Sequence, residues 1–317
     1  MMFQKKVSII FFGFVAVLAI FFYLNNGKTV TLKETTSPVN FIDQIFENSD
    51  QEKITAADAL NDLSLVVEEF DALRVPGESF ENEYSNIKQI FASGDYSKTI
   101  AESRAIEKII RTSIEEENQK PKISITFDAG AGLGATQKLI DYLAASRLKI
   151  TFFSTGKWTE QNTELFKKIL VPKEGLINEL GNHTYGHLHL VSGGLTDEQI
   201  KEEITKTENI FNSLGYPAKP LRQAQGKLLF RYPYGERNAH TDALLKDLGY
   251  VSVYWTVDSL GWQNKQTSEQ IAERIISKIG PKGITLMHVG SNEDVASVPS
   301  VVERLKSQYR FVFVSEL

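Results

Sequence analysis

From Pro121 to the C-terminus, short β-rich runs alternate with amphipathic segments, and this alternation limits the fold more than any other feature of the chain. Strands that are separated by helices usually run parallel, which predicts an α/β fold, either an open sheet or a barrel. The predicted strands are 123–128, 150–154, 228–231, 251–256, 284–288 and 311–314. The predicted helices are 136–146, 160–170, 197–213, 239–248 and 268–279.

Polar side chains stand where these predicted strands end. They are Asp128 after "ITF", His183 and His187 after "GLINELG", Arg231 after "LLF", Asp258 after "VYWTV" and His288 after "GITLM". Each has an ordinary structural explanation when taken alone, such as a capping acid, a core histidine or a surface turn. In an α/β barrel, however, the C-terminal ends of the strands meet at the active site. The set therefore predicts one functional site.

The histidine pair is the strongest local signal for a metal. The chain has five histidines, and three of them lie between residues 183 and 189. If the segment is helical, the four-residue spacing of His183 and His187 puts both imidazoles on one face, where they can chelate an ion. If the segment is a loop, the spacing permits chelation without requiring it. A buried, hydrogen-bonded pair without a metal is the alternative.

Five short motifs carry a resemblance to a known family. In chain order they are "TFDAG", "HTYGH", "RYPYG", "DSLGW" and "LMH". Their order and approximate spacing resemble those of the NodB-homology polysaccharide deacetylases, carbohydrate esterase family 4. The resemblance covers about residues 120–317 and extends to "ITFFST", "GKW" and the final "FVFVSEL". It implies an irregular (β/α) barrel that removes acetyl from an N-acetylated sugar polymer with the help of a divalent metal, usually zinc or cobalt.

The resemblance also implies a role for each motif residue. His183 and His187 match the metal ligands, Asp128 the general base, Arg231 the residue that orients the base, and His288 the general acid. The backbone N–H of Tyr234 matches the oxyanion donor, and Leu286 and Trp262 match the pocket for the acetyl methyl group. A Lewis acid, a base and an acid are all useful against an amide, which is a poor electrophile with a poor leaving group.

Two positions depart from the family pattern. The family's first motif usually has a second acid that is the third metal ligand, and this chain has Ala129 there. The fourth motif usually has an acid just before the tryptophan, paired with the acidic histidine, and this chain has Gly261. Asp258 matches the earlier acid of that motif and compensates only if its loop bends differently. Extra residues at 220–228 precede the third motif.

Three functions fit these residues. The first is an active, metal-dependent deacetylase of a cell-wall or surface polysaccharide, with peptidoglycan amino sugars as the leading substrate. The second is a catalytically impaired relative that binds glycan, and the third is a hydrolase of another amide or ester bond on the same fold. A serine hydrolase is disfavoured because no Gly-x-Ser-x-Gly occurs in the chain. Retention of base, acid, both histidines and the pocket residues favours the first function.

The N-terminal 27 residues predict export. Lys5 and Lys6 precede an apolar run at 7–24, which has the length of a short membrane-spanning helix with its N-terminus inside. A cleavable signal peptide is the alternative, but no small-x-small cleavage site follows the run. Both readings place the rest of the chain outside the cytoplasm, either anchored in the cell membrane or secreted.

Between the apolar run and the α/β part, the sequence predicts a polar linker at 28–50 and a small all-helical domain at 51–119. Thr55 is the expected N-cap of its first helix. A spacer that holds the deacetylase-like domain, 120–317, away from the membrane is favoured over a peptide-binding repeat. The net charge of −5 argues against a nucleic-acid partner. The absence of cysteine excludes disulfides, thiolate zinc sites and a cysteine nucleophile.

Overall fold

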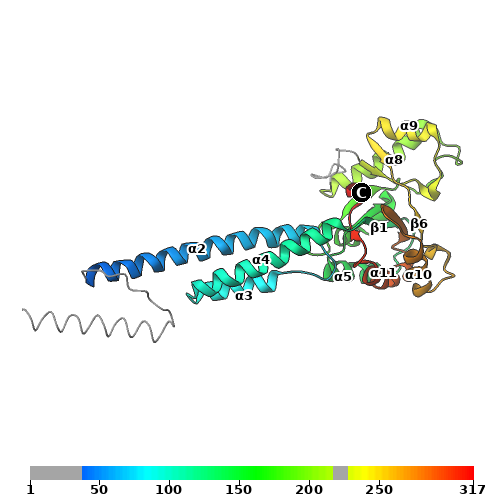
Figure 1. Ribbon diagram of the computed structural model, residues 1–317. Helices are drawn as coiled ribbons and strands as arrows, with labels where there is room; N and C mark the ends of the chain where they lie inside the picture. The colour runs from blue at the N-terminus through cyan, green and yellow to red at the C-terminus, as the bar shows by residue number, and fades with distance from the viewer. Residues whose placement is uncertain (1–37, 217–227) are drawn as a thin grey trace, which may run out of the picture. The chain divides into compact units, whose positions relative to one another are not determined.

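The computed structural model describes residues 38–216 and 228–317, which fall into two compact units. Of the described residues, 38–67 and 80–109 form one unit, and 68–79, 110–216 and 228–317 form the other. Figure 1 shows long helices in the first and the mixed α/β elements in the second. The expected apolar run at 7–24 and most of the loop at 220–228 lie outside the described residues. Among the helices that are described, none is long and apolar enough to cross a membrane.

The N-terminal helices are α2 (Pro38–Leu73), α3 (Glu81–Ala92) and α4 (Tyr96–Gln119). Leu63, Val67 and Phe70 of α2 are nearly inaccessible to solvent. Helix α2 begins earlier than the sequence suggests and includes residues that were expected to be linker. Thr55 is therefore not an N-cap: it lies inside α2, and its hydroxyl donates to the Gln51 carbonyl oxygen at 2.9 Å.

The second unit contains a curled, open parallel sheet flanked by helices, consistent with the predicted (β/α) barrel (Figure 1). The strand order is β5-β4-β3-β2-β1-β7-β6, and β8 pairs with the start of β1. The strands are β1 (Lys122–Ala129), β2 (Ile150–Ser154), β3 (Glu179–Asn182), β4 (Leu228–Phe230), β5 (Tyr250–Ser252), β6 (Val257–Asp258), β7 (Gly283–His288) and β8 (Arg310–Phe311).

The helices of this unit are α5 (Thr136–Ser146), α6 (Gly156–Gln161), α7 (Thr163–Leu170), α8 (Asp197–Ser213), α9 (Ala239–Asp247), α10 (Ser268–Lys278) and α11 (Asn292–Leu305). The predicted bounds of α5 and α8 are confirmed, and those of α9 and α10 are confirmed to within one residue. Capping boxes begin α8, α9 and α10, which explains why these starts are readable from sequence.

Strand β1 is the centre of the sheet, because it is buried along almost its whole length and has β2 and β7 as neighbours. Its apolar residues join those of β2, α5, α7, α10 and α11 in one core. A second core lies among β4, β5, α8 and α9. Continuous burial is typical of a parallel strand covered by helices on its faces.

Several predicted elements differ in the structure. The expected strand at 251–256 ends at Ser252, and the chain pairs again only at β6. The expected helix at 160–170 is two helices that meet at Asn162. Strand β3, at the end of "GLINELG", was predicted without bounds, and helix α11 was not predicted. Strand β3 is four residues long and ends in Gly181 and Asn182, which have low strand propensity.

Arg74 is a buried arginine that ties the segment 68–79 to the α/β part of its own unit. Its guanidinium donates to the carbonyl oxygens of Arg147, Leu148 and Ile177 and to the Asn178 side chain, at 2.8–3.0 Å. Burial, together with the positive charge of Arg147, lowers the pKa of Arg74 to about 10. The side chain therefore remains protonated at neutral pH.

We expect Arg74→Ala to lower the free energy of unfolding by roughly 3–5 kcal/mol, because buried carbonyl groups lose their donors. Urea unfolding measures the change. Arg304→Ala is the matched control, since that exposed arginine contacts only the exposed Glu269 and Glu273. Equal unfolding midpoints for the two variants would contradict the anchoring role of Arg74.

Candidate functional site

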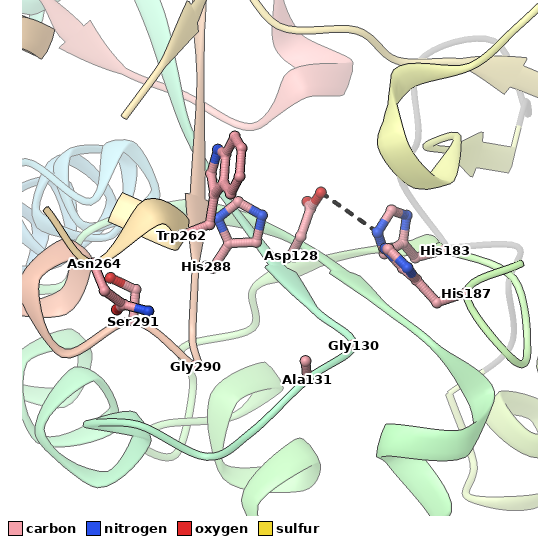
Figure 2. Close-up of a pocket in the computed structure, with 10 residues that line it drawn as sticks. All are labelled: Asp128, Gly130, Ala131, His183, His187, Trp262, Asn264, His288, Gly290 and Ser291. Carbon is pink, nitrogen blue, oxygen red and sulfur yellow. Dashed lines mark ion pairs between the residues drawn. The ribbon is translucent and has the colours of Figure 1, made fainter. Parts of the chain in front are cut away.

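The candidate site lies at the C-terminal ends of the central strands. Asp128 on β1 is the register partner of His288 on β7, so residues 160 positions apart in sequence are neighbours in the sheet. His183 follows β3, and Arg231 follows β4. A pocket of ≈ 280 Å³ is lined by Asp128, His183, His187, Trp262 and His288, with Gly130, Ala131, Asn264, Gly290 and Ser291 (Figure 2). The structure thus brings the base, metal and acid candidates to one cavity.

A buried ion pair fixes the carboxylate of Asp128. One guanidinium nitrogen of Arg231 donates to Asp128 Oδ1 at 2.7 Å and to Thr126 Oγ1 at 2.7 Å. The Arg231 guanidinium also lies over the Phe153 ring, 4.1 Å from its centroid, and its side chain is fully buried. Burial raises the pKa of Asp128, but the charges of Arg231, His183 and His288 outweigh it, and the net pKa is lowered. Asp128 is therefore ionised at neutral pH.

His183 and His187 lie in a loop rather than on a helix, so the helical explanation of their spacing is wrong. A turn made by Asn182 and Thr184 bends the loop: Asn182 Oδ1 accepts from the Thr184 N–H, and Thr184 Oγ1 accepts from the His187 N–H. Both Thr184 and His187 have positive φ, 66° and 58°. The centroids of the two imidazole rings are 4.8 Å apart, and the rings meet edge to face. A strained turn, and not helical periodicity, brings the pair together.

The electrostatics of the two imidazoles suit them to bind a cation. His183 Nδ1 lies 2.8 Å from the Arg231 carbonyl oxygen, which assigns the proton to Nδ1 and leaves the Nε2 lone pair beside Asp128, 3.6 Å from Oδ2. Burial lowers the pKa of His183, and it lowers that of His187 to about 4 with a contribution from His183. Both rings are neutral at pH 7, and a carbonyl acceptor behind a ligating histidine is the usual supporting contact in metal sites.

The two imidazoles suit a divalent ion, but no third side-chain ligand is arranged with them in the described residues. In residues 38–216 and 228–317 no group of three or more acidic or histidine side chains is arranged around a common ion position. The Ala129 side chain, at the place where the family pattern has its third ligand, is completely buried and belongs to the apolar core. An ion held by the two imidazoles would need further ligands, which water, substrate or Asp128 could supply.

Asp258 and Trp262 form the opposite side of the site. Asp258 Oδ1 accepts from the Leu260 N–H at 2.8 Å, and Oδ2 accepts from the Trp262 indole N–H at 3.4 Å. Asp258 therefore positions the half-exposed indole and makes no hydrogen bond to His288. Leu286 is the register partner of Asp258 and is buried, but it is not among the residues that line the pocket.

Tyr234 lies in a tight turn after β4, at Pro233–Gly235, with φ of 60°. Its exposed ring stacks on His189 at 3.8 Å and lies 4.6 Å from the His187 ring. The Tyr234 side chain is thus beside the histidine pair, although Tyr234 is not among the residues that line the pocket.

Two residues that contact the site residues were not predicted from the sequence. Thr126 shares the Arg231 donor with Asp128, and its position two residues before Asp128 on β1 puts both side chains on one face of the strand. Asp294, from the first turn of α11, contacts His288. No local sequence pattern indicates a role for Asp294. Its partner, His288, lies six residues earlier, before the start of a helix that was not predicted.

Comparisons with known proteins agree with the motif pattern. The family model described as polysaccharide deacetylase matches residues 115–253. The chain is 31% identical to the peptidoglycan-N-acetylmuramic acid deacetylase PdaA of Bacillus subtilis (strain 168) over 205 residues, which cover 63% of this chain and 73% of that relative.

Two solved structures are similar in fold and sequence. One is a peptidoglycan N-acetylglucosamine deacetylase, with TM-score 0.55 and 26% identity, covering 62% of this chain and 88% of that chain. The other is a mutant of a carbohydrate esterase family 4 pseudoenzyme with restored enzymatic activity, with TM-score 0.54 and 25% identity, covering 63% and 68%.

Arg231→Gln should raise the pKa of Asp128, because it removes the nearest positive charge while the carboxylate stays buried. Carboxyl carbon chemical shifts of Asp128, followed by NMR against pH, measure the change. Arg237→Gln is the matched control, since Arg237 is a half-exposed arginine paired with Asp242. An Asp128 titration that is the same in wild type and Arg231→Gln would show that Arg231 does not hold the carboxylate ionised.

Proposed function

The chain belongs to the polysaccharide deacetylase family, and we propose that it removes N-acetyl groups from the amino sugars of peptidoglycan with the help of a divalent metal. The observation that carries the proposal is the pocket itself, where an ionised Asp128 lies between His288 and the neutral pair His183 and His187 (Figure 2). A base, an acid and a cation site thus surround one small cavity. Each kind of group assists hydrolysis of an unactivated amide.

In the proposed reaction, Asp128 takes a proton from a water molecule whose oxygen forms a bond to the acetyl carbonyl carbon. The backbone N–H of Tyr234 donates to the oxyanion that develops. His288 then gives a proton to the nitrogen as the C–N bond breaks, which yields acetate and a free amine. A divalent ion held by His183 and His187 would supply Lewis-acid polarisation of the carbonyl.

The charge states support this division of roles. Asp128 has a lowered pKa and is available as a base at neutral pH. His288 is the opposite case: burial lowers its pKa, but Asp294, Asp128 and Asp258 together raise it above the ordinary value. The group with the raised pKa retains a proton to donate. Two titratable groups with pKa values pushed apart are a recognised signature of an acid–base pair.

Relatives support the choice of polymer. Named relatives include a peptidoglycan-N-acetylmuramic acid deacetylase and a peptidoglycan-N-acetylglucosamine deacetylase. Lys5, Lys6 and the apolar run at 7–24 support an anchored, extracytoplasmic location, where peptidoglycan is the available substrate. Peptidoglycan strands and N-acetylglucosamine oligomers, assayed side by side, separate the two sugar types.

A glycan-binding protein without turnover is the second candidate. Ala129 favours it, because the site lacks the third side-chain ligand and two ligands hold an ion less firmly than three. The similar structures include a mutant of a family 4 pseudoenzyme, so inactive proteins of this fold occur. Binding of glycan without release of acetate, with any divalent metal, would establish it.

Asp128→Asn and His288→Ala should each lower acetate release by at least about 100-fold, because each removes one proton-transfer group. Asp197→Asn and His240→Ala are the matched controls, since these two residues form an exposed pair away from the pocket. Full activity in either pocket variant, with the fold intact by circular dichroism, would refute the assigned role.

Zinc binding should depend on the two pocket histidines and not on their neighbour. Calorimetry should detect zinc binding to wild type and to His189→Ala, but not to His183→Ala or His187→Ala. His189 is a control from the same loop, half-exposed and engaged with Glu236. Ala129→Asp should tighten zinc binding if the site lacks only its third ligand. Unchanged zinc affinity in both His→Ala variants would remove the histidine pair from the metal site.

A further inference from the structure

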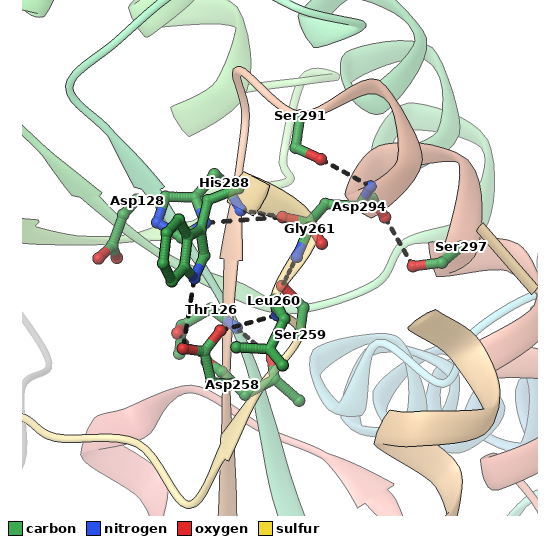
Figure 3. A network of polar contacts seen from close by, with 12 residues as sticks. Thr126, Asp128, Asp258, Ser259, Leu260, Gly261, His288, Ser291, Asp294 and Ser297 are labelled. Atoms are coloured by element: carbon green, nitrogen blue, oxygen red, sulfur yellow. Dashed lines mark hydrogen bonds and ion pairs between the residues drawn. The ribbon is translucent and has the colours of Figure 1, made fainter. Parts of the chain in front are cut away.

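Gly261 leaves a space in the site that another residue fills. A Cβ atom placed on Gly261 would meet Asp294 Oδ1 at 2.1 Å and Asp294 Cγ at 2.4 Å. The carboxylate of Asp294 therefore occupies the room that a side chain at position 261 would enter. The backbone of Gly261 is not in the left-handed region, so a larger residue is excluded by this carboxylate and not by its φ angle. Figure 3 shows Asp294 reaching from α11 toward Gly261 and His288.

Asp294 is more than a helix-capping acid. It occupies the third position of α11, where an acid often bonds the free N–H groups of the first turn. Here the Ser291 hydroxyl accepts from the Asp294 N–H at 3.1 Å, while the Asp294 carboxylate points out of the helix. Its Oδ2 accepts from the backbone N–H of His288 at 2.9 Å, and the side chain is fully buried.

Two buried atoms between Asp294 and His288 lack hydrogen-bond partners. They are Asp294 Oδ1 and His288 Nδ1, and His288 Nδ1 lies 3.6 Å from Asp294 Oδ2. If Asp294 served only to bind the backbone N–H of His288, that hydrogen bond would explain the position of Oδ2 but not the buried, unpaired Oδ1. An unpaired carboxylate oxygen in a dry environment is costly. The His288 Nδ1 faces this carboxylate at 3.6 Å, so a hydrogen bond between them would give Nδ1 the acceptor that it lacks.

The other charged groups that face His288 are already engaged. Asp128, on β1, accepts from Arg231. Asp258, on β6, accepts from Leu260 and Trp262. His183 and His187, on the loop after β3, have lowered pKa values and are neutral at pH 7. Asp294, whose Oδ1 has no hydrogen-bond partner, is thus the buried carboxylate available to pair with the His288 ring.

We propose that Asp294 is the positioning residue of His288, and that it takes from helix α11 the place of the acid absent at Gly261. It accepts the Nδ1–H of the protonated ring and so directs Nε2 to the pocket, where the proton is delivered. This inference rests on the proposed function, in which His288 protonates the leaving amine. It adds that the missing acid is replaced in space by a residue 33 positions later in sequence.

Asp294→Asn tests the charge while it preserves size and the acceptor for the His288 N–H. The His288 pKa, measured by NMR from its ring protons, should fall, and the alkaline limb of the kcat profile should move to lower pH with it. At the wild-type optimum kcat should drop at least about 10-fold with little change in KM. Glu293→Gln is the matched control, because it makes the same change one residue away, and its values should equal those of wild type.

A position swap tests the replacement directly. Asp294→Ala should lose kcat, and Gly261→Asp alone should be destabilised because its Cβ meets the Asp294 carboxylate. The double variant, Gly261→Asp with Asp294→Ala, should recover both the His288 pKa and kcat relative to Asp294→Ala. If the role of Asp294 is purely structural, the carboxylate introduced by Gly261→Asp should not restore the His288 pKa.

The titration separates this inference from the proposed function. If wild type releases no acetate from any glycan, the proposed function fails, and the His288 titration still decides the pairing. A lower His288 pKa in Asp294→Asn than in wild type supports the pair. Equal His288 pKa values in the two proteins would overturn it, whatever the activity.

Discussion

The buried ion pair between Arg231 and Asp128 is the interaction on which the rest of the site depends. A carboxylate at the end of a buried strand would ordinarily be protonated, because a low-dielectric environment disfavours charge. The guanidinium at 2.7 Å reverses that preference. The Arg231 carbonyl oxygen in turn holds His183 Nδ1, so one residue sets both the charge of the base and the tautomer of a metal-ligand candidate. Packing of Arg231 between Phe153 and Trp255 fixes this arrangement.

Around that pair, the pocket has two sides of different electrostatic character. His183 and His187 are neutral and offer lone pairs, which suits a cation. His288 faces three carboxylates and retains a proton, which suits donation to a leaving amine. Asp128 lies between the two sides (Figure 2). The departures at Ala129 and Gly261 lie on opposite sides: the first leaves two histidines as the side-chain candidates for holding a cation, and we propose that Asp294 offsets the second.

Sequence predicted what depends on local periodicity and on strand ends. Helices α5 and α8 have the predicted bounds, and Asp128, His183, His187 and His288 meet in one pocket because parallel strands bring their C-terminal ends together. The resemblance to the family motifs added an expected role for each of these residues.

Sequence could not predict what depends on contacts between distant segments. Strand β3 is too short and too rich in poor strand formers for its bounds to be recognised, and the loop after it is held by a turn with positive φ angles. Asp294 and Arg74 act through contacts whose partners are fixed only by the folded chain. Whether Asp258 compensates for Gly261 depended on the bend of its loop, and in the structure its carboxylate is bonded to Leu260 and Trp262.

The most direct test of the central claim is to measure bound metal and released acetate on one preparation of the chain, with peptidoglycan and N-acetylglucosamine oligomers as substrates. We predict that acetate release rises in proportion to bound divalent metal and that free amine appears in equal amount. Glycan binding without acetate, at full metal occupancy and with every metal tried, would contradict the claim.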